Sequence, residues 1–415
     1  MKQILAEILK DIKPSSKEEK AVKDKADAVI KTINSGLRDA KAILGGSGIK
    51  GTWLRQANDI DIFVKYNYQK YKEKSGQLSS LLESHLKKKG KKIDKLHGSR
   101  DYFQIKEDGY TIEVVPILDI KDAKAAKNIT DISPLHAIWV NKKGKNLKDD
   151  IRLLKQFCKA SKIYGAESYI QGFSGYICEI LIIYYKGFEN LIKAAAKWKD
   201  NITIDVENHW KKKNILLELN RSKISSPLII IDPVQKERNA AAAVSKENVG
   251  IFKRRAKEFL KKPSTDFFKI QPLDKGSLKK RAKDNILIML EAVPKKGKVD
   301  VVGCKIVKAF EHIKAEFAKN DFKVLSQGWE WNKTAFIYFI IKKQQLSDYT
   351  EREGPPLSLK FHADKFKKAH KDTFIKNNRL YAKMQRQFKK PEDLIESLKG
   401  SQYIKEQVQE LRWKG

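Results

Sequence analysis

Hydrophobic residues in the first third of the chain recur with two different periods, which predicts a small mixed sheet flanked by helices. Four segments carry the strand pattern: residues 40–44, 60–66, 102–105 and 110–115. Three segments carry the helix pattern: residues 15–34, 50–55 and 78–89. Ser15 with Glu18 forms a capping box at the start of the first helix, and Asp108-Gly109 is typical of a hairpin turn between the last two strands.

The pattern changes near residue 147 and again past Pro263. The middle part is mostly helical, with helices predicted at 149–162, 175–185 and 188–198 and one buried strand at 228–231. The last part is predicted to contain, in order, the elements 285–293, 299–320, 322–325, 336–341, 380–385 and 391–399. Their order begins strand, helix, strand, strand, as in ferredoxin-like (RRM-like) RNA-binding modules.

We therefore predict a multidomain α+β protein with three parts. Residues 1–146 form a mixed head, residues 147–262 a mainly helical central domain that completes the pocket, and residues 263–415 an α+β body with a short tail.

The charge balance indicates a polyanionic partner. The 415 residues include 86 Lys and Arg against 51 Asp and Glu, a formal net charge of +35, and nucleic acid is the commonest partner for such an excess. A basic protein at a membrane surface is the rival interpretation, but no apolar run reaches a spanning length and no signal-peptide pattern opens the chain. Cys158, Cys178 and Cys304 are scattered in apolar settings, so we expect small buried side chains in a reducing cytoplasm.

Two carboxylates follow the first glycine-rich turn. In Asp59-Ile60-Asp61 the acids lie two residues apart in a strand, so both project from one face while Ile60 turns into the core. The preceding run Leu44-Gly45-Gly46-Ser47 offers backbone N–H groups and a hydroxyl. Carboxylates beside such a turn suit divalent metals and a triphosphate, which predicts nucleotidyl transfer.

Glu113 is the candidate for a third carboxylate ligand. It occupies a polar position in the apolar strand at 110–115, where an ionised group is costly to bury unless it is paired or binds metal. The alternative is a side chain that faces solvent or pairs with a lysine. The acidic pair upstream favours the metal role.

The segment from Gly46 to Leu54, followed by Asp59-Ile60-Asp61-Ile62-Phe63, resembles the polymerase beta nucleotidyltransferase superfamily, and more narrowly the class I, archaeal-type CCA-adding enzymes. Further matching pieces follow in order along the chain: Ser133-Pro134-Leu135-His136, Arg152-Leu153-Leu154-Lys155, Ile163-Tyr164-Gly165-Ala166-Glu167, Gly172-Phe173-Ser174-Gly175-Tyr176, Asp232-Pro233, Arg238-Asn239-Ala240-Ala241, Gly354-Pro355-Pro356 and Arg379-Leu380-Tyr381-Ala382. One motif matches easily by chance, whereas an ordered series over nearly the whole chain does not.

The resemblance implies a polymerase-beta-like head that binds two Mg²⁺ ions through Asp59, Asp61 and Glu113. It also implies that Ser47 and Lys50 contact the triphosphate of CTP or ATP. The C-terminal part would bind the acceptor stem and the elbow of tRNA.

The resemblance further implies a nucleotide pocket lined by His136, Lys155 and Tyr164, with Arg238 helping to select the base. From the residues alone, Lys155 is equally well a solvated lysine, Tyr164 a packed core residue and His136 a hydrogen-bonded structural histidine.

The sequence departs from the family pattern at three places. Glu113 stands where an aspartate is usual, and Lys50 replaces an arginine, which keeps the charge and loses bidentate phosphate binding. After Arg412-Trp413 the sequence stops where relatives continue with further helix, so we expect fewer contacts with the tRNA elbow.

The predicted function is template-independent addition of C, C and A to the 3′ end of tRNA, from CTP and ATP, with release of pyrophosphate. A poly(A)-type polymerase would instead extend RNA with ATP alone, and a non-catalytic RNA-binding protein would show no magnesium-dependent turnover. A small-molecule nucleotidyltransferase is disfavoured by the high positive charge. A homodimer is compatible with the sequence.

Overall fold

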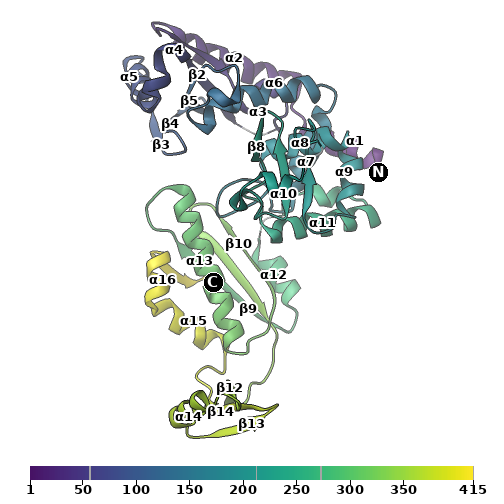
Figure 1. Ribbon diagram of the computed structural model, residues 1–415, viewed down its shortest axis with the longest axis vertical. Coiled ribbons are helices and arrows are strands. Elements are labelled where there is room, and N and C mark those ends of the chain that lie inside the picture. Colours follow the sequence, from purple (N-terminus) through teal and green to yellow (C-terminus); the bar gives the residue numbers. More distant parts are fainter. Residues whose placement is uncertain (56–57, 212, 272, 415) are drawn as a thin grey trace. The chain divides into compact units, whose positions relative to one another are not determined.

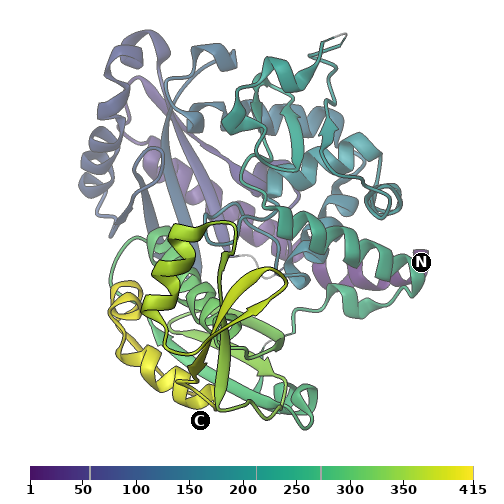
Figure 2. The ribbon, with the colours of Figure 1, turned by 60° about the horizontal axis from the view of Figure 1, so that its bottom comes forward.

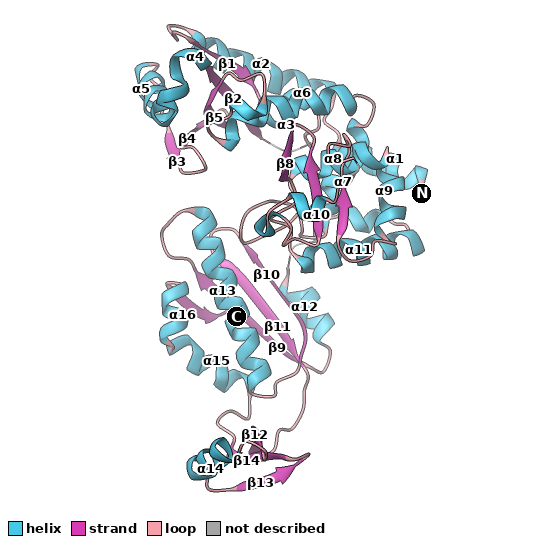
Figure 3. Cartoon of the chain, in the orientation of Figure 1, coloured by secondary structure: helices cyan, strands magenta, loops and turns pink. Residues whose placement is uncertain are grey.

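The chain folds as two units, Met1–Gln271 and Pro272–Gly415 (Figure 1). The structure, a computed structural model, describes residues 1–55, 58–211, 213–271 and 273–414. Helices and strands are mixed in both units, as Figure 3 shows. Within these described ranges, no helix combines the length and the apolarity needed to cross a membrane.

The first half of the first unit is built on a five-stranded sheet in the order β1-β2-β5-β4-β3. Its strands are β1 (Ala40–Leu44), β2 (Asp59–Tyr66), β3 (Asp94–Leu96), β4 (Tyr102–Glu107) and β5 (Tyr110–Leu118). Strands β2 and β5 run parallel, and the other neighbours are antiparallel. The accompanying helices are α2 (Ser16–Asn34), α3 (Gly46–Lys50), α4 (Tyr68–Tyr71), α5 (Leu78–Lys88) and α6 (Ser133–Lys143), with 3-10 turns at Lys72–Gln77, Ala123–Ala125 and Ile129–Ile132.

Two of these helices cover the sheet with apolar side chains. Val29 of α2 and Leu82 of α5 belong to the same buried core as Ile62 and Val114 of the sheet. The predicted capping box at the start of α2 is confirmed, since Ser15 accepts from the Glu18 backbone and the Glu18 carboxylate accepts from the Ser15 backbone.

The helix predicted at residues 50–55 is wrong. The glycine turn is itself helical as α3, and this helix ends at Gly51, which has a left-handed φ of 62°. A glycine in this conformation terminates a helix at little cost, so residues 52–55 continue as an irregular segment.

The second half of the first unit is mainly helical. Its helices are α1 (Lys2–Ile12), α7 (Lys148–Ala160), α8 (Gly175–Tyr185), α9 (Phe188–Ala195), α10 (Ile215–Glu218) and α11 (Lys246–Lys261), with 3-10 turns at Arg221–Lys223 and Thr265–Phe268. A three-stranded sheet accompanies them, formed by β6 (Ile202–Ile204), β7 (Leu228–Asp232) and β8 (Gln235–Asn239). Helix α1, at the start of the chain, packs into this core through Leu5 and Ile8.

The aromatic core of this half surrounds Phe157 of α7, which contacts the rings of Phe188, Phe252 and Phe259. Cys158 and Cys178 are buried in the same core as predicted, whereas Cys304 in the second unit is only partly buried. The buried setting predicted for Cys304 is therefore wrong, because α13 (Val299–Lys319) enters the core of its unit through other positions, such as Val302, Ile306 and Phe310.

The second unit contains a four-stranded antiparallel sheet in the order β10-β11-β9-β15. Its elements are α12 (Lys275–Ala282), β9 (Ile286–Val293), α13 (Val299–Lys319), β10 (Val324–Trp331), β11 (Ala335–Ile341), α15 (Pro391–Gly400), α16 (Gln402–Gln407) and β15 (Glu410–Trp413). Leu290 and Phe339 face the core shared with α13 and α15, while Met289 and Tyr338 face α12. The alternation along the strands therefore covers both faces of the sheet with helices.

A small module is inserted between β11 and α15. It contains β12 (Tyr349–Pro356), α14 (Lys360–Ala369), β13 (Thr373–Lys376) and β14 (Arg379–Gln385), with the strands in the order β12-β14-β13 (Figure 2). The predicted strand at 380–385 belongs to this separate sheet.

Candidate active site

Three carboxylates lie side by side on β2 and β5. These parallel strands pair Asp61 with Glu113 and Asp59 with Thr111, so Asp59, Asp61 and Glu113 project from the same face of the sheet. Ile60 lies on the opposite face and is 2% exposed. The one-face arrangement of the two aspartates is therefore confirmed. We call these three residues the carboxylate face.

The carboxylate face concentrates negative charge. Burial and the charges of Asp61 and Asp59 raise the pKa of Glu113 to about 7. Burial also raises the pKa of Asp61, and Lys50 and the Ser47 backbone N–H only partly oppose this effect. Acids that repel one another in this way gain from a bound cation.

The three carboxylates do not converge on a common position where one metal ion could bind. In the part of the chain that the structure describes, no group of three or more His, Cys, Asp or Glu side chains is arranged to hold a metal ion. Gln104, opposite Glu113 on β4, hydrogen-bonds the Glu113 carboxylate. Mutual repulsion and this hydrogen bond both favour separation of the three acids.

The turn before β2 approaches Asp61 closely. The Gly45 backbone N–H donates to the Asp61 carbonyl over 2.8 Å, and the Ser47 N–H donates to the Asp61 carboxylate. A Cβ at Gly46, which has a φ of 52°, would lie 1.5 Å from Asp61 Oδ2. Only glycine fits this position, and the predicted phosphate ligand Ser47 is therefore held beside the carboxylate face.

Lys50 and Lys155 converge on one buried acid, Glu179 of α8. The Lys50 ammonium donates to Glu179 Oε2 over 2.7 Å, and the Lys155 ammonium donates to Oε1 over 3.1 Å. The Thr52 hydroxyl donates to Oε1 over 2.9 Å. We call Lys50, Thr52, Lys155 and Glu179 the lysine cluster. It contradicts the alternative that Lys155 is a solvated surface lysine, since that side chain is 4% exposed.

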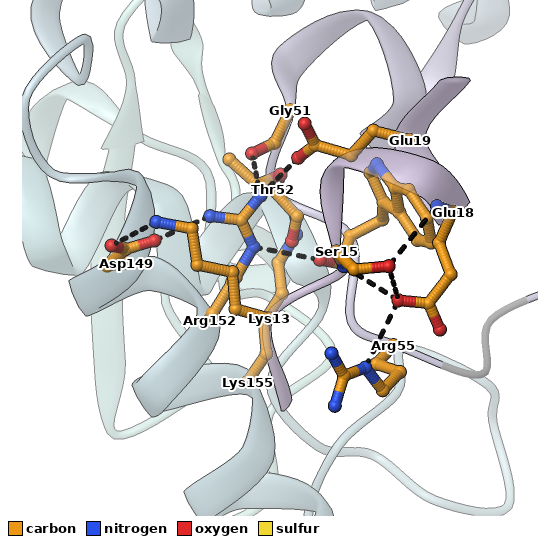
Figure 4. A network of polar contacts seen from close by, with 11 residues as sticks. Lys13, Ser15, Glu18, Glu19, Gly51, Thr52, Arg55, Asp149, Arg152 and Lys155 are labelled. Atoms are coloured by element: carbon orange, nitrogen blue, oxygen red, sulfur yellow. Dashed lines mark hydrogen bonds and ion pairs between the residues drawn. The ribbon is translucent and has the colours of Figure 1, made fainter. Parts of the chain in front are cut away.

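Helix α7 holds the segment that follows α3. Arg152 donates to the carbonyls of Gly51 and Trp53 over 2.8 and 3.0 Å, and Lys155 donates to the Thr52 carbonyl over 3.2 Å. Figure 4 shows Arg152 between this segment and Asp149, to which it also donates over 2.6 Å. Two residues one helical turn apart therefore capture three successive carbonyls.

A second buried acid, Asp232 at the end of β7, gathers the other predicted residues. His136 and Arg238 donate to its Oδ2 over 3.1 and 2.5 Å, and Tyr176 donates to Oδ1 over 3.1 Å. The rings of His136 and Tyr176 stack with centroids 4.0 Å apart. Burial opposes ionisation of Asp232, but the hydrogen bond and charge of His136, with the charge of Arg238, lower its pKa to about 2. We call these four residues the Asp232 cluster.

Tyr164 lies with the lysine cluster. A Cβ at Gly175 would be 3.1 Å from the Tyr164 hydroxyl and 3.5 Å from Lys155 Nζ, so both groups border the start of α8. Burial raises the pKa of Tyr164, so its phenol stays protonated as a hydrogen-bond donor.

The predicted site residues thus fall into three groups that α3, α7 and α8 connect. Tyr176 and Glu179 occupy one face of α8, one turn apart, and join the Asp232 cluster to the lysine cluster. Lys50 and Lys155 both act electrostatically on Asp61 and so join the lysine cluster to the carboxylate face.

Four residues of these clusters were not predicted as site residues from the sequence: Glu179, Thr52, Tyr176 and Asp232. A signal for Glu179 was present, because it is the one acid in the apolar run Gly175–Tyr185. Asp232 likewise follows four fully apolar strand positions. Thr52 carries no comparable signal, since its hydroxyl finds a partner 127 residues away.

Comparison with known proteins places three domain families along the chain. A "Nucleotidyltransferase domain" matches residues 24–136, a "tRNA nucleotidyltransferase, second domain" matches 149–269, and a "CCA-adding enzyme, C-terminal domain" matches 296–410. The chain is similar to solved structures of Cid1, described as an RNA terminal uridylyl transferase, with a TM-score of 0.51 at 14% identity. That likeness covers 66% of this chain and 98% of the Cid1 chain, and it supports the fold.

Curated relatives extend the similarity over almost the full length. The chain is 36% identical to the CCA-adding enzyme of Nanoarchaeum equitans, over 93% of this chain and 95% of that protein. It is 30% identical to the CCA-adding enzyme of Methanocaldococcus jannaschii, over 96% of this chain and 90% of that protein. The chain therefore belongs to the family of archaeal-type CCA-adding enzymes, the tRNA nucleotidyltransferases that its sequence resembles.

Proposed function

We propose that CCA addition takes place at the carboxylate face, with the triphosphate of CTP or ATP beside Ser47 and Lys50. The observation that carries this assignment is the pairing of Asp61 with Glu113 on parallel strands, next to a turn whose Gly46 touches Asp61. Family membership does not favour poly(A)-type tailing or a non-catalytic role.

Asp59, Asp61 and Glu113 are the proposed ligands of two Mg²⁺ ions. Carboxylate oxygens are the hard donors that Mg²⁺ prefers, and the raised pKa of Glu113 reports the repulsion that a cation would relieve. When bound, the ions supply charge neutralisation at the attacking and leaving oxygens. Glu113 reaches further than an aspartate would, which suits its position on the neighbouring strand.

The chain's own residues orient the nucleotide. Ser47 offers a hydroxyl and Lys50 an ammonium to the phosphates. Lys155 on α7 and Tyr164, in the segment between α7 and α8, lie together beside the start of α8. The tRNA 3′ oxygen bonds to the α-phosphorus, its proton is released, and the bond to the departing pyrophosphate breaks. Catalysis of this kind depends chiefly on position and charge.

The Asp232 cluster is proposed to recognise the base. Asp232 fixes the guanidinium of Arg238 and the ring of His136, which leaves their remaining donors at defined positions. This arrangement supports the predicted role of Arg238 in selecting CTP or ATP.

The second unit is proposed to bind the tRNA acceptor stem and elbow as a ferredoxin-like module. The strand order β10-β11-β9-β15 with helices after β9 and before β15 supports this classification, and the module of β12 to β14 is an insertion in it. The division of the chain into domains 1–146, 147–262 and 263–415 remains part of this proposal. A homodimer also remains part of it, and light scattering of the purified protein would test the oligomeric state.

Removal of one carboxylate tests the site. In the Asp61→Ala variant, incorporation of CMP into tRNA lacking its CCA end should fall below detection, while tRNA binding stays largely unchanged. The matched control is Asp119→Ala, because Asp119 follows the opposite end of β5 and pairs with Lys65. Robust CMP addition by Asp61→Ala would contradict the assignment of the carboxylate face.

A further inference from the structure

Glu179 is a buried carboxylate that has no role in the proposed reaction. Its side chain is fully buried on α8, yet both oxygens are paired, Oε2 with Lys50 and Oε1 with Thr52 and Lys155. Burial opposes its ionisation, but the charges of Lys155 and Lys50 outweigh burial and lower its pKa. Glu179 is therefore a fixed anion inside a site that must receive a polyanionic nucleotide.

The charges of the lysine cluster do not balance. Two amino groups face one carboxylate, which can neutralise only one ammonium; burial and the charge of Lys50 lower the pKa of Lys155, and the charge of Glu179 opposes this effect. If Glu179 keeps its contacts with Lys155 and Thr52, its carboxylate is still paired with the Lys155 ammonium and still accepts the hydrogen bond from the Thr52 hydroxyl. Lys50 is then the cation that the cluster can release without leaving a buried charge unpaired.

Lys50 and Lys155 also differ in access. The side chain of Lys155 is 4% exposed and is further tied to the Thr52 carbonyl and hydroxyl. The side chain of Lys50 is 12% exposed and ends α3, whose backbone carries Ser47. Lys50 also lowers the pKa of Asp61 by its charge, and its effect is larger than that of Lys155, so its ammonium acts on both Glu179 and the carboxylate face. A flexible stem with a rotating ammonium can change partners in a way that a fixed guanidinium fork cannot.

We propose that Glu179 is a positioning residue that holds Lys50 in the free enzyme, and that a phosphate oxygen of the incoming nucleotide takes Lys50 from it. Lys155 and Thr52 stay on Glu179 throughout. This inference rests on the proposed placement of Lys50 at the triphosphate. When pyrophosphate leaves, Glu179 recaptures Lys50, so the same carboxylate weakens the binding of both nucleotide and pyrophosphate.

Equilibrium binding of CTP to the full chain, with Mg²⁺ and without tRNA, tests the exchange. Glu179→Gln keeps an oxygen for Thr52 and Lys155 but removes the charge that competes for Lys50. The dissociation constant of CTP should fall about tenfold, as expected for loss of one competing charge-assisted hydrogen bond. The KM for CTP and the inhibition constant of inorganic pyrophosphate should fall with it, without a rise in kcat. Unchanged or weaker CTP binding overturns the proposal, because Glu179→Gln would not tighten CTP binding if Glu179 had only a structural role.

A double-mutant cycle with Lys50→Met separates this inference from the proposed site. Lys50→Met alone should weaken CTP binding, and in that background Glu179→Gln should have no further effect. If Lys50→Met leaves CTP binding unchanged, the placement of Lys50 at the triphosphate fails and the exchange fails with it. If Lys50→Met weakens binding but Glu179→Gln does not tighten it, only the exchange fails.

A second variant covers the case in which Glu179→Gln does not fold, as judged by circular dichroism. Glu179→Asp keeps the charge and withdraws the carboxylate by one methylene from Lys50. It should tighten CTP binding in the same direction by a smaller factor. Unchanged or weaker binding in this variant also overturns the proposal.

Discussion

Single atoms decide the geometry around Asp61. The carboxylate accepts from the Ser47 backbone, and its Oδ2 fills the space where a side chain at residue 46 would begin. The reacting groups of nucleotidyl transfer must be placed to within a fraction of an ångström. If Asp61 is a metal ligand as proposed, the absence of a Cβ at Gly46 is a requirement of the chemistry as well as of the turn.

Gly46→Ala should reduce CMP incorporation by about a hundredfold, because the new methyl must displace Asp61. The positive φ of residue 46 adds about 1–2 kcal/mol of strain, which a domain of this size tolerates. Circular dichroism and a single-nucleotide incorporation assay would check both parts. The control is Gly250→Ala on α11, where a Cβ would meet no atom within 4 Å. Near-normal CMP incorporation by Gly46→Ala would show that the position of Asp61 beside residue 46 is not needed for activity.

Asp232 predicts an acid-dependent loss of stability. Its pKa is about 2 in the folded chain and about 3.8 when unfolded, so its stabilising contribution is complete above pH 4 and is lost as the pH falls towards 2. The shift corresponds to about 2 kcal/mol of unfolding free energy. Between pH 4 and 2, urea denaturation should show a steeper loss of stability in the native chain than in Asp232→Asn. Equal slopes for the two proteins would refute the role of Asp232 as a buried ionised acceptor.

At the scale of secondary structure, α7 and α8 hold the turn to which phosphate binding is assigned in the proposed function. Helix α7 supplies Arg152 and Lys155 to the carbonyls of residues 51–53, and α8 supplies Glu179 to the side chains of Lys50 and Thr52. The turn is thus fixed from the helical half of the unit, although its residues belong to the sheet half.

Replacement of Arg152 tests this arrangement. Arg152→Met leaves the carbonyls of Gly51 and Trp53 without their donor, which should lower the free energy of unfolding by on the order of 2–3 kcal/mol. The KM for CTP should rise several-fold because α3 is less firmly held, and tRNA binding should be little changed. Arg254→Met on the exposed side of α11 provides the matched control. A variant with native stability and native KM would show that α7 does not hold the turn.

Most elements could be predicted because their apolar periodicity is local. The helices at α2, α7, α8 and α13 and the strands β1, β2 and β9 match their predicted segments within a few residues. The helix at 50–55 was misplaced because Gly51 takes a left-handed conformation that no hydrophobic pattern reveals. The module from β12 to β14 was also missed as a separate sheet, since strand pairing depends on contacts that are distant in sequence.

At the scale of the whole molecule, the candidate site was only partly predictable. The aspartate pair followed from a two-residue spacing, but the lysine cluster joins residues that are 129, 127 and 24 positions apart. A lysine in a chain with 86 basic residues carries no individual signal, and only the fold shows which lysines are buried. Family membership points to tRNA as the substrate, in agreement with the net charge of +35.

Extension of a tRNA that lacks its 3′ CCA, with CTP alone, ATP alone and both, followed by sequencing of the products, tests the central claim most directly. The account predicts addition of two C residues with CTP alone and a complete, terminated CCA end with both nucleotides, in each case dependent on Mg²⁺. Unlimited tailing with ATP alone, or no magnesium-dependent extension under any of these conditions, would contradict it.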